Sequence, residues 1–197
     1  MDRLAARMSP LPPNVMIALA AGLVGLIALV WLAVRAWRRH RAGPRQVFRR
    51  ISAAQLVDVL IPDGLDGEIH LDHLLLTGSG ILVVDLRNAS GAVFGGEQMD
   101  DWTVLSSERR YTFRNPLGAL EARVHAVRRL ADKVPVMGRV VFVGDVEFAG
   151  GQVPGAVTLA ELESEFGHAE AEQARQSTEA FKFFWTRIDE ASKRYAA

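Results

Sequence analysis

Apolar and polar positions along the chain predict one long apolar helix followed by a series of strands and helices. Residues 15–34 (VMIALAAGLVGLIALVWLAV) are twenty consecutive positions without a charged side chain. About twenty helical residues cross the hydrocarbon core of a bilayer, and the apolar core of a cleaved signal peptide is shorter. We therefore expect one transmembrane helix over residues 15–36, preceded by a short extracytoplasmic segment, residues 1–14.

Beyond the first fifty residues, short apolar runs separated by glycine, proline and acidic residues predict strands. The run at residues 55–61 ends at Pro62-Asp63-Gly64, which is typical of a turn. The run RVVFV at residues 139–143 is continuously apolar, as in a strand inside a sheet. The predicted strands cover residues 55–61, 68–76, 81–86, 93–94, 102–105, 110–113, 139–143 and 156–159.

Helical periodicity begins at Asn115-Pro116, which predicts an N-cap followed by a proline in the first turn. From Leu117 to about residue 133, apolar residues recur at spacings of three and four, so one helix face is expected to be buried. This order of elements predicts an α/β domain over residues 51–165 with a mixed central sheet and flanking helices. A C-terminal helix is expected over residues 166–197. Its aromatic residues are interpreted as packing residues: Phe181, Phe183, Phe184 and Trp185.

The 23 basic and 23 acidic residues are unevenly distributed. Residues 1–50 hold nine arginines and one acidic residue, and seven of the arginines follow the apolar stretch. Because positive residues beside a span stay in the cytoplasm, we expect a single-pass protein of the plasma (inner) membrane, with its N-terminus outside and its soluble domain cytoplasmic. Residues 37–50 are interpreted as a basic juxtamembrane linker that binds anionic lipid, with a helix stop at Gly43-Pro44.

The rest of the chain is acidic, which argues against non-specific nucleic-acid binding driven by phosphate neutralisation. The absence of cysteine fits a reducing compartment. Oligomeric state is not predicted. One group of basic residues beyond the linker is interpreted either as a phosphate-binding rim or as a solvated surface: Arg109, Arg110, Arg114, Arg123, Arg128 and Arg129.

The segment HLDHLLLTGSGILVVDLRN, which begins at His70, combines a buried hairpin pattern with charged residues at its open end. If its Thr-Gly-Ser-Gly turn closes a regular antiparallel hairpin, Asp72 lies opposite Asp85 and His70 lies opposite Arg87. Side chains alternate between the two faces of a sheet, so these four residues share one face. His73 is expected on the opposite face, in a structural role.

Two carboxylates directly opposed across a hairpin repel one another. A divalent cation, basic neighbours, or protonation of one aspartate would relieve the repulsion. Paired carboxylates suit Mg²⁺, which polarises phosphoryl oxygens and activates bound water. The structural alternative pairs Arg87 and His70 with the two aspartates. All three interpretations stay open on the sequence alone.

Several motifs follow the order and approximate spacing of a known family over residues 55–143. They are Ile61-Pro62-Asp63-Gly64, Leu71-Asp72-His73, the run GILVVDLRN from Gly80, Ser90-Gly91 with Gly95, Trp102, and Asn115-Pro116-Leu117. In this combination the segment resembles a NERD (nuclease-related) domain, a branch of the PD-(D/E)xK phosphodiesterase superfamily.

The resemblance implies a restriction-endonuclease-like sheet in which Asp72 and Asp85 bind a divalent metal, Mg²⁺, with the peptide carbonyl of Leu86 sharing it. Arg87 stands where the family places the lysine of its (D/E)xK motif. A guanidinium stays protonated, so Arg87 is expected to bind phosphate or to stabilise developing charge. The candidate phosphate-binding residues are Arg87, Arg123 and His70.

Two further positions depart from the family pattern. No acidic residue lies between Asp2 and Asp58 to supply the glutamate that the family has before its first strand, and Gly118-Ala119 stands where the family has a glutamine. One hypothesis is a membrane-anchored, Mg²⁺-dependent phosphodiester hydrolase acting on nucleic acid. The alternative is a catalytically degenerate NERD domain acting as a membrane-tethered binding or scaffolding module. A third hypothesis is a protein that recruits a partner through its C-terminal helices.

Overall fold

The computed structural model of the chain describes residues 43–167 and 171–194. The chain divides into two compact units, residues 1–42 and residues 43–197. The predicted transmembrane helix falls in the first unit and lies outside the described residues. Within the described part, no helix has both the length and the apolar character needed to span a bilayer.

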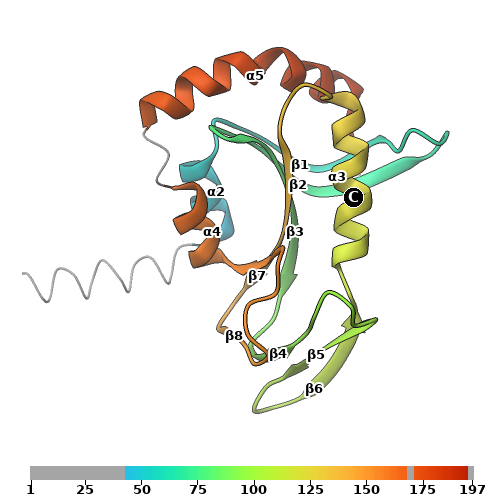
Figure 1. The fold of residues 1–197 in the computed structure, drawn as a ribbon, viewed down its shortest axis with the longest axis vertical. Coiled ribbons are helices and arrows are strands. Elements are labelled where there is room, and N and C mark those ends of the chain that lie inside the picture. Colours follow the sequence, from blue (N-terminus) through green and yellow to red (C-terminus); the bar gives the residue numbers. More distant parts are fainter. Residues whose placement is uncertain (1–42, 168–170, 195–197) are drawn as a thin grey trace, which may run out of the picture. The chain divides into compact units, whose positions relative to one another are not determined.

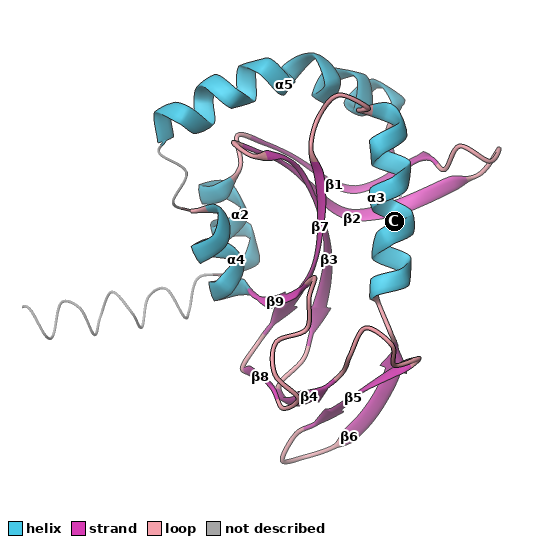
Figure 2. Ribbon diagram, in the orientation of Figure 1, coloured by secondary structure: helices cyan, strands magenta, loops and turns pink. Residues whose placement is uncertain are grey.

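A six-stranded mixed sheet forms the centre of the second unit (Figure 2). Strand β2 pairs in antiparallel fashion with β1 and with β3, whereas β3, β7 and β9 pair in parallel. The two-residue strand β10 pairs with the outer edge of β1. In spatial order the strands are β10 (Lys193–Arg194), β1 (Ala54–Pro62), β2 (Glu68–Thr77), β3 (Gly80–Asn88), β7 (Val136–Val143) and β9 (Ala156–Thr158).

A second, four-stranded sheet follows directly from β3, because the chain leaves β3 at Asn88 and enters β4 at Gly91. The sequence predicted a single sheet, and the structure has two. The strands of the second sheet are short, and β5 buries alternate residues, so this sheet has one buried and one exposed face. Its order is β6 (Arg110–Arg114), β5 (Asp101–Leu105), β4 (Gly91–Phe94) and β8 (Val146–Phe148).

Helices cover both faces of the six-stranded sheet. Helices α2 (Pro44–Ile51) and α4 (Leu159–Phe166) lie on one side of the sheet, and α3 (Leu117–Leu130) lies on the other (Figure 1). Helix α5 (Ala171–Ala191) contacts α3 and strands β1 to β3. The two sheets share a core, in which Trp102 of β5 stacks on Phe142 of β7 with ring centroids 6.2 Å apart.

The segment expected to be a linker contains helix α2. Pro44 was interpreted as a helix stop, but it occupies the first turn of α2, where a missing N–H and a fixed φ favour helix initiation. Val47, Phe48 and Ile51 of this helix are buried. Residues 44–51 are therefore part of the folded domain.

Other local predictions differ from the structure at the ends of the elements. Helix α3 begins one residue later than expected, with Pro116 at the N-cap position, and Asn115 Oδ1 accepts a hydrogen bond from Leu117 N–H at 2.9 Å. The C-terminal helix ends at Ala191, and Lys193–Arg194 forms β10 instead of a last helical turn. The aromatic residues of α5 do pack: Trp185 is buried, and Phe181 and Phe184 lie against the core, whereas Phe183 is 73% exposed.

Candidate functional site

The β2–β3 hairpin has the predicted register from His73 to Thr77, and the predicted pairs of Asp72 with Asp85 and of His70 with Arg87 lie beyond the paired residues. Leu76 pairs with Ile81 and His73 pairs with Val84. The backbone pairing ends at His73, and at the preceding residue of β2 the carboxylate of Asp72 accepts a hydrogen bond from the Leu86 N–H at 3.2 Å. The side chain of Asp72 thus contacts β3 where the backbone pairing stops.

Asp85 lies at the centre of a group of charged side chains and is 1% exposed. Arg87 Nη2 donates a hydrogen bond to Asp85 Oδ2 at 3.0 Å. Arg87 Nε forms an ion pair with Asp85 Oδ1 at 3.0 Å, but its N–H group does not form a hydrogen bond with that oxygen. A third contact comes from helix α3, where Arg123 Nη1 donates to Oδ2 at 2.9 Å. Both carboxylate oxygens of Asp85 therefore face guanidinium groups.

Arg123 connects two strands. Its Nε donates to the backbone carbonyl of His70 on β2 at 2.8 Å, while its Nη1 contacts Asp85 on β3. The side chain reaches the sheet because α3 packs closely on β7 at Gly138, where any Cβ would meet Val124 and Leu120. Its exposed fraction is 18%, compared with 39% for Arg87.

His70 lies between two carboxylates. Its Nε2 is 2.5 Å from Asp58 Oδ1, and its Nδ1 is 3.4 Å from Asp72 Oδ1. Asp58 was not among the sequence-predicted site residues. It has a φ of +57°, a left-handed conformation in which aspartate is more common than most residues. A single aspartate inside the apolar run QLVDVLI was the available signal.

Burial raises the pKa of Asp85 above its ordinary value of 3.8, and the charge of Asp72 acts in the same direction. Arg87 and Arg123 oppose this shift. Basic neighbours, one of the three ways to relieve the repulsion between the aspartates, are therefore present. They do not cancel the cost of burying the Asp85 charge.

The family pattern implies Mg²⁺ as the metal of this site. Asp72 and Asp85 supply oxygens, the ligands that Mg²⁺ prefers. However, each of their four carboxylate oxygens already contacts an N–H group or ring nitrogen of the protein. Among the described residues, no group of three or more His, Cys, Asp or Glu side chains is arranged to hold a metal ion. In this arrangement the residues do not fit Mg²⁺ unless guanidinium groups leave Asp85.

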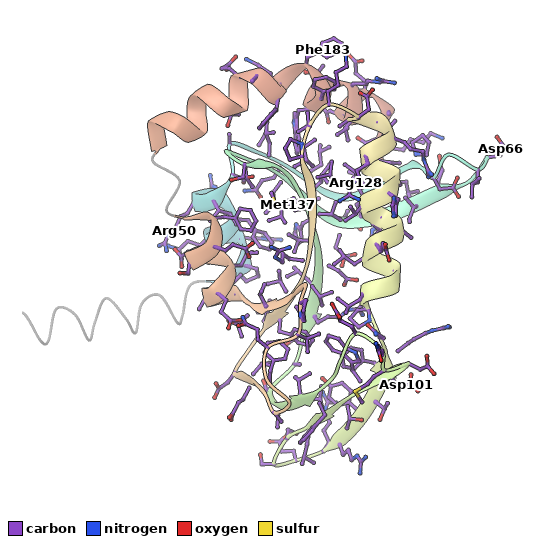
Figure 3. The ribbon with its side chains drawn as sticks, in the orientation of Figure 1. Arg50, Asp66, Asp101, Arg128, Met137 and Phe183 are labelled. Carbon is purple, nitrogen blue, oxygen red and sulfur yellow. The ribbon has the colours of Figure 1, made fainter. Side chains whose placement is uncertain are left out.

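The remaining predicted residues lie apart from this cluster. Of the six arginines considered as a phosphate-binding rim, Arg123 contacts it, whereas Arg128 donates to the Val136 carbonyl and Arg109 lies over the Tyr111 ring. Arg128 is on α3 in Figure 3. His73 packs its ring edge against Phe48 of α2, with ring centroids 4.9 Å apart, in the structural role expected for it.

A pocket of about 520 Å³ lies beside the start of α3. Asn115 helps to build its wall by donating to the carbonyls of Glu97 and Met99. Gly118, one of the two residues in the region where the family pattern has a glutamine, lines this pocket, and a Cβ there would meet no atom within 4 Å. The pocket therefore has room for a side chain at position 118.

The comparison with known proteins agrees with the motifs quoted above. The sequence profile of the NERD family, described as Nuclease-related domain, matches residues 39–143, just over half of the chain. The chain belongs to the NERD family. The matched segment of this NERD domain includes helix α2 and all residues of the charged cluster: Asp58, His70, Asp72, Asp85, Arg87 and Arg123.

One relative of this NERD domain is an uncharacterized protein of Bacillus anthracis. The two are 25% identical over 121 residues, which cover 58% of this chain and 57% of the relative. The chain thus spans a little more than half of the relative's length. No solved structure matched the chain.

Proposed function

We propose that this protein is a catalytically degenerate NERD domain that binds the phosphate groups of nucleic acid without hydrolysing them, tethered to a membrane. The observation that carries the proposal is the engagement of Asp85 by Arg87 and Arg123. The carboxylate that would hold metal in a nuclease here orients two guanidinium groups. Family membership supports a nuclease-related ancestry and a restriction-endonuclease-like assignment for the six-stranded sheet.

Binding without hydrolysis fits the chemistry of Arg87. A guanidinium carries five N–H donors and stays protonated, so it suits phosphate recognition and is a poor general base. Arg87 uses Nε and Nη2 on Asp85, and its Nη1 forms no hydrogen bond or ion pair with the described residues. Because 39% of its side chain is exposed, a phosphate oxygen can approach that nitrogen.

Membrane tethering is supported by the sequence of residues 15–34 and by helix α2. Arg45 and Arg49 of α2 are exposed, while its apolar face is buried in the domain. Exposed arginines beside a span attract anionic lipid. The proposed topology has the N-terminus outside and residues 43–197 in the cytoplasm, which flotation and protease-protection measurements on membrane vesicles would test.

Fluorescence anisotropy with labelled single-stranded DNA, double-stranded DNA and RNA tests the binding function, using the full chain in detergent micelles. We expect Arg87→Gln to weaken binding about tenfold, as for the loss of a charged hydrogen bond. Arg109→Gln is the matched control, because it removes one exposed arginine outside the cluster. Equal losses in the two variants would contradict a specific site.

A second candidate function is an Mg²⁺-dependent nuclease, in which Asp72, Asp85 and the Leu86 carbonyl would hold the metal after Arg87 and Arg123 release Asp85. Membership of the nuclease-related family favours this candidate. Cleavage of the same substrates in Mg²⁺ or Mn²⁺, lost in Asp72→Ala, would establish it and exclude the non-hydrolytic function. An increase in melting temperature on adding metal, abolished by Asp85→Asn, would support the same conclusion.

A further inference from the structure

We propose that the outer edge of β6 binds an extended segment of a partner protein, which adds a strand to the second sheet and carries acidic residues opposite Arg110 and Arg114. This inference goes beyond the proposed function, because it concerns a protein ligand and a strand that contributes no residue to the charged cluster. Strand β6 is the last strand of the second sheet, and no described strand pairs with its outer edge (Figure 2).

The backbone of β6 has hydrogen-bonding groups available at this edge. Ser106 N–H donates to the Arg109 carbonyl at one end of the β5–β6 pair, and Asn115 N–H donates to the Asp100 carbonyl at the other. Hydrogen-bonded and non-hydrogen-bonded pairs alternate along an antiparallel ladder. The register between the two ends therefore directs the N–H and C=O groups of alternate β6 residues away from β5, where an added strand would use them. These residues are Arg110, Thr112 and Arg114.

The side chains of Arg110 and Arg114 determine which strand this edge accepts. Both are exposed on the same face of the sheet, opposite Leu105 and Asp101 of β5, and neither guanidinium forms an ion pair with a described residue. Pairing with β6 of a second copy would place Arg110 of one copy opposite Arg114 of the other, and like charges directly opposite each other are destabilising. The edge therefore disfavours self-association and favours a strand with carboxylates at these two positions.

The intervening residues, Tyr111 and Phe113, point towards the core side of the sheet. Both are half-buried, and the ring of Phe113 lies 6.2 Å from the ring of the buried Trp102, measured between centroids. Apolar side chains of an added strand would extend the core at this edge. An antiparallel ligand therefore has an acidic, an apolar, a small polar, an apolar and an acidic residue in succession.

The backbone groups distinguish a protein strand from a nucleic acid as the ligand. A single-stranded nucleic acid could place phosphates on Arg110 and Arg114, but it has no regular series of N–H and C=O groups at the spacing of a strand. An extended peptide matches the guanidinium groups and the backbone edge together.

The test measures fluorescence anisotropy of labelled peptides, with the full chain in detergent micelles and no nucleic acid present. The probe contains the core Glu-Val-Thr-Val-Glu, which pairs its glutamates with Arg114 and Arg110, and we expect it to bind saturably. Replacing both glutamates by lysine should weaken binding at least about tenfold. N-methylation of the central threonine, whose N–H points towards β6, should also weaken binding at least about tenfold. N-methylation of a valine, whose N–H points away from β6, should change the affinity by about twofold or less.

The matching variant of the protein combines Arg110→Glu with Arg114→Glu. It should bind the glutamate peptide at least about tenfold more weakly than wild type and the lysine peptide at least about tenfold more tightly. The gain of lysine-peptide binding would show that the variant is folded. Arg187→Glu is the control, because Arg187 is exposed on α5 and belongs to neither sheet. It should change the affinity by about twofold or less, since exposed charges at a distance are screened by salt.

Absence of saturable peptide binding by wild type up to about 1 mM would overturn the inference. So would equal binding of the peptide that is N-methylated at threonine. Single-stranded DNA binding that the double variant loses, without peptide binding by wild type, would assign the edge to nucleic acid, and a dimer that the double variant cannot form would assign it to a second copy of the chain. The proposed function is tested separately, with nucleic acid and Arg87→Gln, so that either can fail without the other.

Discussion

Asp72 and His73 are neighbours in β2, and their side chains enter two differently built surroundings. Asp72 contacts the Leu86 N–H and the ring of His70, within the cluster that Arg123 of α3 completes. His73 packs against Phe48 of α2, and its Nδ1 is buried without a hydrogen-bond partner among the described residues. On one side of the sheet, the buried carboxylate of Asp85 is paired with two guanidinium groups. On the other side, the Nδ1 of His73 has no hydrogen-bond partner among the described residues.

The difference shows which groups can stay charged in the interior. Burial lowers the pKa of His73 below its ordinary value of 6.5, with Asp72 opposing this shift and Arg45 adding to it. No carboxylate lies close enough to His73 to form an ion pair with it in the described structure, so the neutral ring is favoured. Asp85, which is more deeply buried, is held between two guanidinium groups.

The largest expected effect breaks the apolar side of this comparison. Phe48 of α2 is 1% exposed and packs against the ring of His73. Phe48→Ala should therefore destabilise the domain by about 3–5 kcal/mol, through lost burial and an unfilled cavity. Urea unfolding of the full chain in micelles, followed by circular dichroism, measures this loss. Phe183→Ala is the control: Phe183 is 73% exposed, and its removal should change stability by about 0.5 kcal/mol or less.

The next effect breaks the charged side. Asp85→Ala should destabilise the domain by about 2 kcal/mol, because it leaves the guanidinium of Arg123 partly buried without its carboxylate. Arg87→Ala should cost about 1 kcal/mol or less, because its side chain is 39% exposed and partly screened by solvent. Denaturant midpoints of the two variants give the comparison, and a larger loss for Arg87→Ala would show that Arg123 is not the main partner of Asp85.

The hairpin could be predicted from the sequence because its register depends on local chemistry. A tight turn and a period of two fix which residues face each other, and the observed pairing of Leu76 with Ile81 follows. The approach of Asp72 to β3 is a consequence of that register. The strand that contains Trp102, predicted over residues 102–105 from a short apolar run, is observed as β5 with one residue more at its start.

The partners of the hairpin could not be predicted in the same way. Arg123 reaches Asp85 because α3 rests closely on β7 at Gly138, a contact set by packing between distant segments. Pro44 fits both the end and the start of a helix. The start was selected by the burial of Phe48 in a domain whose other elements lie later in the chain. The left-handed conformation of Asp58 likewise depends on the fold around it.

A smaller effect tests the neutral state of His73. His73→Phe keeps the ring contact with Phe48 and removes the unpartnered Nδ1, so it should stabilise the domain by about 1 kcal/mol at pH 7.5. Because the folded pKa lies below the unfolded one, wild type should lose stability as the pH falls below 6.5 towards the folded pKa. Urea unfolding at pH 7.5 and pH 5.5 should show this loss reduced in His73→Phe. An equal loss in both proteins would assign the pH dependence to other groups.

The smallest effect concerns the ion pair that joins the two helices on the His73 side of the sheet. Arg50 of α2 lies towards α4 (Figure 3), and its Nη1 is 2.8 Å from Glu163 Oε1. Its side chain is 45% exposed, so Arg50→Ala should cost about 0.5 kcal/mol, and less in high salt. Urea midpoints at low and high salt measure this. If Arg50→Ala lowered the free energy of unfolding as much as Phe48→Ala, α2 would be held in place mainly by its charges. The two sides of the sheet would then not differ in how they are stabilised.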